Sequence, residues 1–348
     1  MKRKLISAIL MSAVMAGILT GCGGSAETER EIAPEAVMEG DFEKVTLTMS
    51  CNGTDLANDT RAARLFADKI YEKSGGRITV NVFPNDQLAG GNMSKGLEMV
   101  CGGSVDLDVH STSIIANLDN RLMVSTLPWL FSDYQEAEDA FYGAGGEFIN
   151  SVLEEKGVYY LGAVHNGFKA MTNSRHPIQS LEDLKGLKIR IPGGEFFGAF
   201  YSAFGASPQA MSWSEVFTAL QQGTIDGHDN SLGTINSANV QEVQKYISIS
   251  RHTYEAFTFM VNARRFDSLN EDTQNLIRLC AEEATKEMNR QIIADEDALK
   301  EKFAEESGCE IYTFSEEDMA AFREVVKPLM DEYKEIYGEE ACVSFGVE

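Results

Sequence analysis

The stretch that decides the fold runs from Leu184 to Asn230 and reads LKGLKIRIPGGEFFGAFYSAFGASPQAMSWSEVFTALQQGTIDGHDN. Its first part, Leu187–Pro192, alternates apolar and basic residues, which predicts a strand with Lys188 and Arg190 on the face opposite the apolar side chains. The proline ends the strand because it cannot donate a ladder hydrogen bond. An arginine there is placed to form two parallel hydrogen bonds with a carboxylate. On the pattern alone, an ordinary surface arginine fits equally well.

A helix and a second strand follow. Ser212 and Glu215 form an S-x-x-E capping box, which predicts a helix that starts at Trp213 and closes at Gly223. The start of a helix favours a bound anion. The Trp213 indole either presents its flat face to a ligand or packs as an ordinary aromatic residue of the core. Residues Thr224–Asn230 then form a short strand that runs into a loop. The resulting strand, helix and strand predict a βαβ crossover, and ligands of open α/β sheets bind beyond the carboxyl ends of such strands.

The N-terminus carries an export signal. Basic residues at 2–4 precede an apolar run, Leu5–Leu19, and Leu19-Thr-Gly-Cys22 resembles a bacterial lipobox. The apolar run is shorter than the ~20 residues of a membrane span, and no other segment could span. We therefore expect a signal peptide over residues 1–21, lipidation of Cys22, and a disordered, lipidated tether over 22–44. The lipid is then the only attachment to the membrane.

Charge and length limit the function further. The formal net charge is −24, so nucleic acid is a poor partner, and an anionic ligand would need local positive charge in its site. About 300 residues remain after the tether, enough for two domains with their own cores.

Alternating strands and helices predict an α/β fold whose two lobes are not simply consecutive. We expect the chain to cross between lobes near Asn166 and again near Arg251. A long helical pattern from Ser268 to about Glu306 would span nearly 60 Å and brace both lobes. The expected lobe I comprises residues 45–165 and 252–285, and lobe II comprises residues 166–251 and 286–348. The other predicted elements are strands at 45–50, 78–83, 105–109, 158–164, 167–173, 246–251 and 257–262, and helices at 60–74, 93–100, 135–156 and 315–337.

Sequence motifs argue against an enzyme. The chain lacks G-x-S-x-G, H-E-x-x-H and the P-loop pattern. Its five histidines show no ligand spacing, so we expect no metal and no cofactor. Only His228, two residues before Asn230, deserves inspection as a site residue.

Five motifs together resemble the extracytoplasmic solute-binding proteins of TRAP transporters, the DctP-type family. In order, they are the lipobox, Gly75-Gly-Arg-Ile-Thr-Val-Asn-Val-Phe-Pro84 with Gln87-Leu88, Leu127-Pro-Trp-Leu-Phe131, Asp183-Leu-Lys-Gly-Leu-Lys-Ile-Arg-Ile-Pro192, and Ala219-Leu-Gln-Gln-Gly-Thr-Ile-Asp-Gly227. The resemblance covers nearly the whole chain from Val45 to the long helix. It implies a periplasmic-binding-protein-like fold, with two α/β lobes that close on a small organic acid.

The resemblance also implies a binding site. The arginine that binds the ligand carboxylate falls on Arg190, an asparagine on Asn230, and a flanking aromatic on Trp213. Lys169 stands where the family often has a second arginine, and Asp229 where glutamate is usual. Asn52 and Ser111 fall where the other lobe lines the cleft. Asn230 could instead cap the helix that follows it, since asparagine is a favoured N-cap.

The function implied by the resemblance is capture of a small organic acid and its delivery to the membrane subunits of a TRAP transporter. A sugar acid such as a uronate and a C4-dicarboxylate both fit. The protein would work as a monomer, outside the cytoplasm and anchored by lipid. Two alternatives stay open: a sensory binding protein without a transporter, and a secreted enzyme that acts on acidic sugars.

Overall fold

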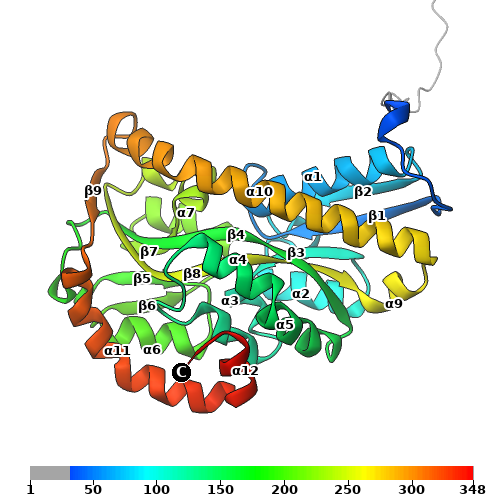
Figure 1. Cartoon of the computed structure of the whole chain (residues 1–348). Coiled ribbons are helices and arrows are strands. Elements are labelled where there is room, and N and C mark those ends of the chain that lie inside the picture. The colour runs from blue at the N-terminus through cyan, green and yellow to red at the C-terminus, as the bar shows by residue number, and fades with distance from the viewer. Residues whose placement is uncertain (1–31, 348) are drawn as a thin grey trace, which may run out of the picture.

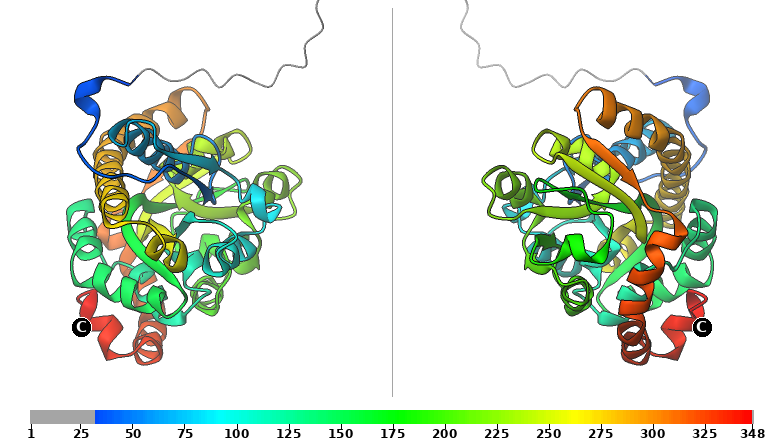
Figure 2. Two further views of the ribbon diagram at one scale, coloured as in Figure 1. Left: turned by 90° about the vertical axis from the view of Figure 1, so that its right-hand side faces the viewer. Right: turned by 90° about the vertical axis from the view of Figure 1, so that its left-hand side faces the viewer.

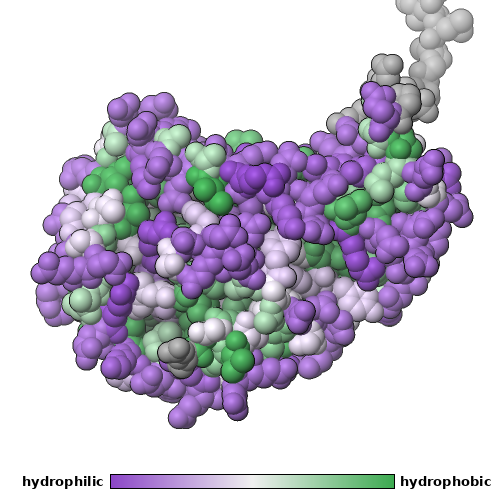
Figure 3. Space-filling model, viewed as in Figure 1, coloured by the Kyte–Doolittle hydropathy of each residue, from purple (hydrophilic) through white to green (hydrophobic). Residues whose placement is uncertain are grey.

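The computed structural model describes residues 32–347. The predicted signal peptide and Cys22 lie outside the described residues. The α/β class is confirmed: the strands of this part of the chain form one mixed sheet with helices packed around it (Figure 1, Figure 2). None of the helices in residues 32–347 combines the length and the apolar character that a membrane span requires. The face shown in Figure 3 is covered mainly by hydrophilic residues.

The strands are β1 (Val45–Cys51), β2 (Ile78–Phe83), β3 (Leu107–Ser111), β4 (Val158–Asn173), β5 (Lys188–Ile191), β6 (Ser207–Ala210), β7 (Gly227–Ser231), β8 (Tyr246–Asn262) and β9 (Glu310–Thr313). The helices are α1 (Asn58–Lys73), α2 (Met93–Gly102), α3 (Thr112–Ile115), α4 (Tyr134–Tyr142), α5 (Ala144–Glu154), α6 (Glu195–Ala203), α7 (Trp213–Gln221), α8 (Leu232–Ser237), α9 (Ala263–Asp267), α10 (Glu271–Glu305), α11 (Glu316–Tyr337) and α12 (Glu339–Ser344). Short 3-10 turns, η1 to η5, lie at Pro34–Ala36, Gln87–Ala89, Asn120–Thr126, Leu181–Leu184 and Val240–Glu242.

Two long strands hold the sheet together. The strand order is β2-β1-β3-β8-β4-β7-β5-β6, and β9 also pairs with β8. β1 lies parallel to β2 and β3, and β5 lies parallel to β6 and β7, whereas β8 runs antiparallel to β3 and β4. We call β2, β1, β3 and the parts of β4 and β8 beside them the first half-sheet. The second half-sheet consists of β7, β5, β6, β9 and the remainder of β4 and β8.

The prediction of four short strands in β4 and β8 was wrong, because each of the two is one continuous strand. The register between them shifts between His165 and Gly167 and again between Phe168 and Ala170. These irregularities interrupt the alternation of side chains, so the sequence pattern breaks although the hydrogen-bonded ladder continues. The predicted crossing points near Asn166 and Arg251 fall at or beside the irregular region.

The predicted βαβ unit is also more complex than expected. Between β5 and α7 the chain adds α6 and the parallel edge strand β6. Phe196, Phe197 and Phe200 of α6 are fully buried, so this aromatic helix forms part of the core. β5 therefore pairs with β6 on one side and with β7 on the other.

The bracing helix is confirmed. α10 contains 35 residues, so it is about 50 Å long, and it runs along the outside of both half-sheets (Figure 1). Its N-cap is Asn270, whose side chain accepts a hydrogen bond from the Thr273 N–H, and not Ser268 as expected. Ile277 belongs to a core beneath the first half-sheet, whereas Phe303 belongs to another core in the second.

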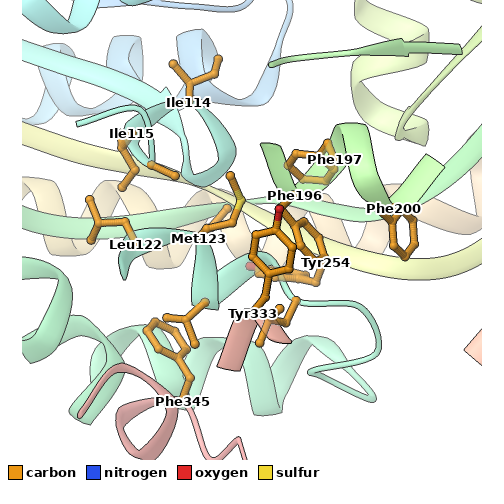
Figure 4. Close-up of a cluster of buried hydrophobic side chains, with 14 of the residues drawn as sticks. Ile114, Ile115, Leu122, Met123, Phe196, Phe197, Phe200, Tyr254, Tyr333 and Phe345 are labelled. Carbon is orange, nitrogen blue, oxygen red and sulfur yellow. The ribbon is translucent and has the colours of Figure 1, made fainter. Parts of the chain in front are cut away.

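A third core lies on the side of the molecule opposite α10, where α11 and α12 run (Figure 1). Figure 4 shows Met123, Phe196 and Tyr254 converging in it, with Tyr333 of α11 and Phe345 after α12 beneath them. Tyr333 packs against Phe196 of α6. Phe345 packs against Phe141 of α4, so the C-terminal segment contacts both of these helices.

The predicted tether ends earlier than expected. Phe42 is buried, and the Asp41 N–H donates to Asp272 Oδ2 at 2.7 Å. The Glu43 N–H donates to Thr273 Oγ1 at 2.9 Å. Residues 41–43 are therefore anchored at the start of α10.

Candidate ligand-binding site

The six residues predicted as ligand contacts line a single cleft between the two half-sheets. Each of them is buried. They are Asn52 after β1, Ser111 at the end of β3, Lys169 in β4, Arg190 in β5, Trp213 at the start of α7 and Asn230 in β7.

Arg190 carries unused hydrogen-bond donors into this cleft. Ile189 and Ile191 fill the core beside it, so the alternation of β5 turns Arg190 to the other face. Its Nε and Nη2 groups both donate to the Met211 carbonyl oxygen, at 3.1 and 2.9 Å. Among residues 32–347 no carboxylate lies within 4 Å of the guanidinium and Nη1 has no hydrogen-bond partner. A guanidinium has five N–H donors, so an incoming anion can still be bound.

The Arg190 side chain is buried. Burial lowers the pKa of Arg190 to about 10, and the negative charges of Asp229 and Glu255 oppose this effect only in part. The guanidinium carbon lies 5.5 Å from the centre of the Trp213 ring, a distance that permits a cation–π interaction. Arg190 remains charged at neutral pH and lacks a counter-ion in direct contact.

Two buried carboxylates balance the positive charge of Lys169. Its Nζ lies 3.2 Å from Glu255 Oε2 and 3.6 Å from Asp229 Oδ2. Burial alone would lower the pKa of Lys169, but the two carboxylates outweigh it and raise that pKa. Burial likewise acts to raise the pKa of Asp229, but the attraction of Lys169 and of His252, whose Nε2 lies 3.4 Å away, holds that pKa well below its usual range. Lys169, Arg190 and Glu255 thus line the cleft, and Asp229 lies buried beside Lys169.

Asn230 points its amide nitrogen towards the cleft. Its Oδ1 accepts hydrogen bonds from the Ser231 N–H at 3.0 Å and from Asn166 Nδ2 at 3.3 Å, so Nδ2 is left without a partner among the described residues. The N-cap of α8 is Ser231, whose Oγ accepts from the Thr234 N–H. The capping role considered for Asn230 therefore belongs to its neighbour.

Asn52 is held in one orientation by a chain of buried polar groups. Its Nδ2 donates to Asp86 Oδ2 at 2.6 Å. His110 lies between two acids, with Nε2 2.9 Å from Asp86 Oδ1 and Nδ1 2.6 Å from Asp108 Oδ2. Burial acts to lower the pKa of His110, but these carboxylates outweigh burial and raise it to about 10. His110 is therefore protonated at neutral pH and holds Asp86 as a hydrogen-bond acceptor.

Ser111 and Glu255 form a second fixed group on the same wall. The Ser113 hydroxyl and the Ser113 N–H both donate to Glu255 Oε1, the latter at 3.2 Å. Ser111 Oγ lies 3.1 Å from Ser113 Oγ. Asn166 Nδ2 donates to Glu255 Oε2 at 3.1 Å, so Glu255 contacts both half-sheets.

Several cleft residues were missed from the sequence. Glu255, Asn166 and Ser113 line the cleft but were not predicted. The available signal was the position of Glu255 inside a long apolar strand, because an unpaired glutamate is almost never buried there. His228, singled out for inspection, packs behind Trp213 with 5.8 Å between ring centres and does not line the cleft.

A second hollow lies on the other side of Asn166, between α1, α8 and α10. Its polar groups are largely paired with one another: the Tyr134 hydroxyl donates to Glu296 at 2.6 Å, and Lys302 Nζ donates to Asn236 at 2.9 Å. Within residues 32–347 no cluster of three or more histidine, cysteine or acidic side chains is arranged to hold a metal ion. The cleft around Arg190 is therefore the better candidate site.

The sequence was also compared with known families. A family model described as bacterial extracellular solute-binding protein, family 7, matches residues 50–336. The chain belongs to this family. Family 7 proteins bind solutes outside the cytoplasm, which confirms the class of protein predicted from the motifs.

Sequence matches to individual members of family 7 cover most of the chain. The 2,3-diketo-L-gulonate-binding periplasmic protein YiaO of Escherichia coli is 31% identical over 252 residues, 72% of this chain and 76% of the relative. The C4-dicarboxylate-binding periplasmic protein DctP of Rhodobacter capsulatus is 30% identical over 285 residues, 82% of this chain and 85% of the relative.

A solved structure of a family member confirms the two-lobed fold. It is the sugar acid binding protein DctPAm from Advenella mimigardefordensis in complex with galactonate, with a TM-score of 0.82 and 30% identity. The match covers 88% of this chain and 97% of that one.

Proposed function

We propose that this family 7 protein captures a small organic acid in the cleft and delivers it to the membrane subunits of a TRAP transporter. The observation that carries the proposal is the buried guanidinium of Arg190, which keeps unused donors towards the cleft and has no carboxylate within 4 Å among the described residues. A ligand carboxylate would supply the missing counter-ion through charge-assisted hydrogen bonds. Sugar acids and C4-dicarboxylates, named for its relatives, are both candidates.

Closure of two lobes would surround the ligand. We place the lobe boundaries near Asn166 and Arg251, as expected from the sequence, so that the half-sheets belong to different lobes. Contacts across the cleft support this proposal: the Ser214 hydroxyl donates to the Gly91 carbonyl at 2.9 Å, and the Thr54 hydroxyl to the Ser237 carbonyl at 3.0 Å. Export by residues 1–21, lipidation at Cys22 and action as a monomer complete the proposal.

Replacing Arg190 tests the site. Binding of organic acids is measured by thermal shift and calorimetry, because a ligand that binds only the folded state raises its stability. Arg190→Ala should lose on the order of 3–5 kcal/mol of binding free energy, since the ligand carboxylate would be buried without its partner. Arg323→Ala is the matched control, because this exposed arginine of α11 does not line the cleft; it forms an ion pair with the exposed Glu316 and lies over the Trp129 ring.

The control should bind the best acid as tightly as the unaltered protein. If Arg190→Ala retains wild-type affinity, the site is elsewhere. Delivery is tested separately by uptake of the labelled acid into proteoliposomes that contain the transporter subunits, with and without the binding protein.

A further inference from the structure

The side chains on the β1–β3 side of the cleft present hydrogen-bond acceptors to a ligand. An ionised carboxylate can only accept hydrogen bonds. Asp86 therefore binds the amide nitrogen of Asn52 and fixes the orientation of the Asn52 side chain. Asn52 Oδ1 has no partner among the described residues, and Asn52 lines the cleft. The amide therefore offers the ligand an acceptor.

The serines of this wall have the same polarity. Glu255 also only accepts, so the Ser113 hydroxyl must give its hydrogen to Glu255. The Ser111 hydroxyl then gives its hydrogen to Ser113 Oγ, 3.1 Å away. Ser111 keeps its lone pairs for the cleft, which makes a second acceptor beside Asn52.

The opposite wall donates. Arg190 has free N–H groups, and Asn230 presents Nδ2 because its Oδ1 is already occupied. A carboxylate matches this wall, because its oxygens accept several hydrogen bonds at once. The cleft thus needs a ligand with an accepting end and a donating end.

Charge limits the ligand to one carboxylate. Lys169 is already shared between Glu255 and Asp229, so Arg190 is the one cation of the cleft, within residues 32–347, that lacks a carboxylate within 4 Å. A second ligand carboxylate would meet the acceptors Asn52 and Ser111 and the negative Glu255. Burying such a charge without a partner is strongly unfavourable.

From this polarity we infer that the ligand is a polyhydroxylated monocarboxylate, such as an aldonate or a uronate, and not a dicarboxylate. This inference rests on the proposed function and narrows it. An ammonium group could also donate to the wall formed by Asn52 and Ser111. Both of these acceptors are neutral, however, and Glu255 is already engaged by Lys169, so an ammonium ion would lose its hydration without a free counter-charge.

A matched series of acids tests the inference by calorimetry. The six-carbon set is D-gluconate, hexanoate, adipate and 6-aminohexanoate, and the four-carbon set is D-erythronate, butyrate, succinate and 4-aminobutyrate. D-galacturonate is added as a cyclic hydroxylated acid. We expect a hydroxylated acid to bind at least about tenfold more tightly than every hydroxyl-free, dicarboxylate or amino counterpart, the factor that one to two well-placed hydrogen bonds provide.

The outcomes separate the two levels of the proposal. If any hydroxyl-free, dicarboxylate or amino counterpart binds as tightly as the hydroxylated acids, and Arg190→Ala abolishes that binding, the inference is wrong and the proposed function stands. If no acid binds, or if Arg190→Ala changes nothing, both are wrong.

Asn52→Leu tests the accepting wall directly. It should weaken the hydroxylated acid about tenfold and leave hexanoate or butyrate unchanged, because those ligands offer no hydroxyl. Asn81→Leu, on the edge strand β2 and exposed, is the control and should change neither. An equal loss for both kinds of acid would show that Asn52 supports the shape of the cleft and does not accept a ligand hydroxyl. Should Asn52→Leu not fold, the matched series on the unaltered protein still decides the inference.

Discussion

Lys169 stands at a position where the resemblance to family 7 suggests a second arginine. A lysine is a compact charge with three donors, whereas an arginine presents a planar fork. Here the lysine lies between Glu255 and Asp229, so much of its charge is balanced by the protein itself. The substitution leaves Arg190 as the main cation for a ligand, which agrees with a single carboxylate.

His110 predicts a specific dependence of stability on pH. Its pKa is raised to about 10, against 6.5 for the free side chain, through Asp108 and Asp86, with Asp59 nearby. A raised histidine pKa stabilises the folded state fully below pH 6.5, and this stabilisation is lost as the pH rises towards 10. The free energy of unfolding should therefore fall between pH 7 and 10, by at most about 1.4 kcal/mol per pH unit from this group.

The comparison with His110→Gln isolates this effect. Denaturant unfolding of both proteins at pH 7, 8, 9 and 10 gives the difference in unfolding free energy, which should shrink as the pH rises. A difference that stays constant over this range would mean that His110 is neutral in the folded protein.

Some residues of the site could be predicted from the sequence around them, and others could not. Arg190 and Trp213 lie beside regular patterns, a strand alternation and a capping box, so the sequence indicated both their elements and their orientation. Asn166 and Glu255 lie at or near the irregular parts of β4 and β8, where no periodic pattern applies. Their roles depend on pairing between segments far apart in the chain, which local spacing does not contain.

At the level of elements, β4 and β8 connect the half-sheets without a flexible linker. The register shifts near Gly167 and the left-handed backbone of Arg251, with φ of 48°, mark the point where the strands bend. The guanidinium carbon of Arg251 lies 3.7 Å from the centre of the Phe168 ring. Its Nη1 lies 3.5 Å from Glu296 Oε1 of α10. Movement between the lobes is therefore expected at these irregularities.

Gly167 should be sensitive to substitution. Its φ is 120°, and a Cβ atom placed on it would lie 2.9 Å from the Tyr134 hydroxyl oxygen. Gly167→Ala should lower the free energy of unfolding by about 1–3 kcal/mol, because the backbone would be strained and Tyr134 displaced. Denaturant unfolding measures the change.

Gly198 provides the matched control. It lies inside α6, and a Cβ atom there would meet no atom within 4 Å. Gly198→Ala should stabilise the protein by about 0.4–1 kcal/mol, since alanine reduces the entropy of the unfolded chain. If both variants behave alike, the strained backbone at Gly167 does not matter for stability.

Elements with caps were predicted best. The start of α7 follows from the predicted capping box of Ser212, which the structure contains. The last helix was predicted from its amphipathic pattern over 315–337, and Ser315 caps α11. The long helix was recognised, although Asn270 caps it. α6 was missed because its three phenylalanines were not read as a helical stripe. β4 and β8 were divided because the bulges between them follow from strand pairing and not from local sequence.

For the whole molecule, the contact between Gly91 and Ser214 offers a way to lock the cleft. A Cβ atom on Gly91 would lie 3.3 Å from Ser214 Cβ, close to the usual separation in a disulfide of about 3.5–4.5 Å. The Gly91→Cys, Ser214→Cys double variant, oxidised after the best acid has bound, should release it at least about tenfold more slowly than the reduced variant. Cysteine at Gly91 adds backbone strain, since φ there is 82°.

Dialysis followed by calorimetry measures the release. The unaltered protein, treated in the same way, is the control. The five cysteines of residues 32–347 are free; four of them are buried and Cys101 is partly exposed. Release that is equally fast from the oxidised and reduced double variants would show that the ligand leaves by a route other than this mouth.

The order of the strands also has a consequence for synthesis and export. β3 lies parallel to β1 on one side, but its other neighbour is Phe257–Val261 of β8. A chain synthesised from its N-terminus therefore exposes β1, β2 and β3 long before that neighbour arrives. An unpaired strand edge is a template for aggregation. Because β8 pairs with β4 as well, its arrival supplies the missing neighbour of β3 and of β4 together, and an N-terminal product that ends before β8 leaves the edges of both strands unpaired.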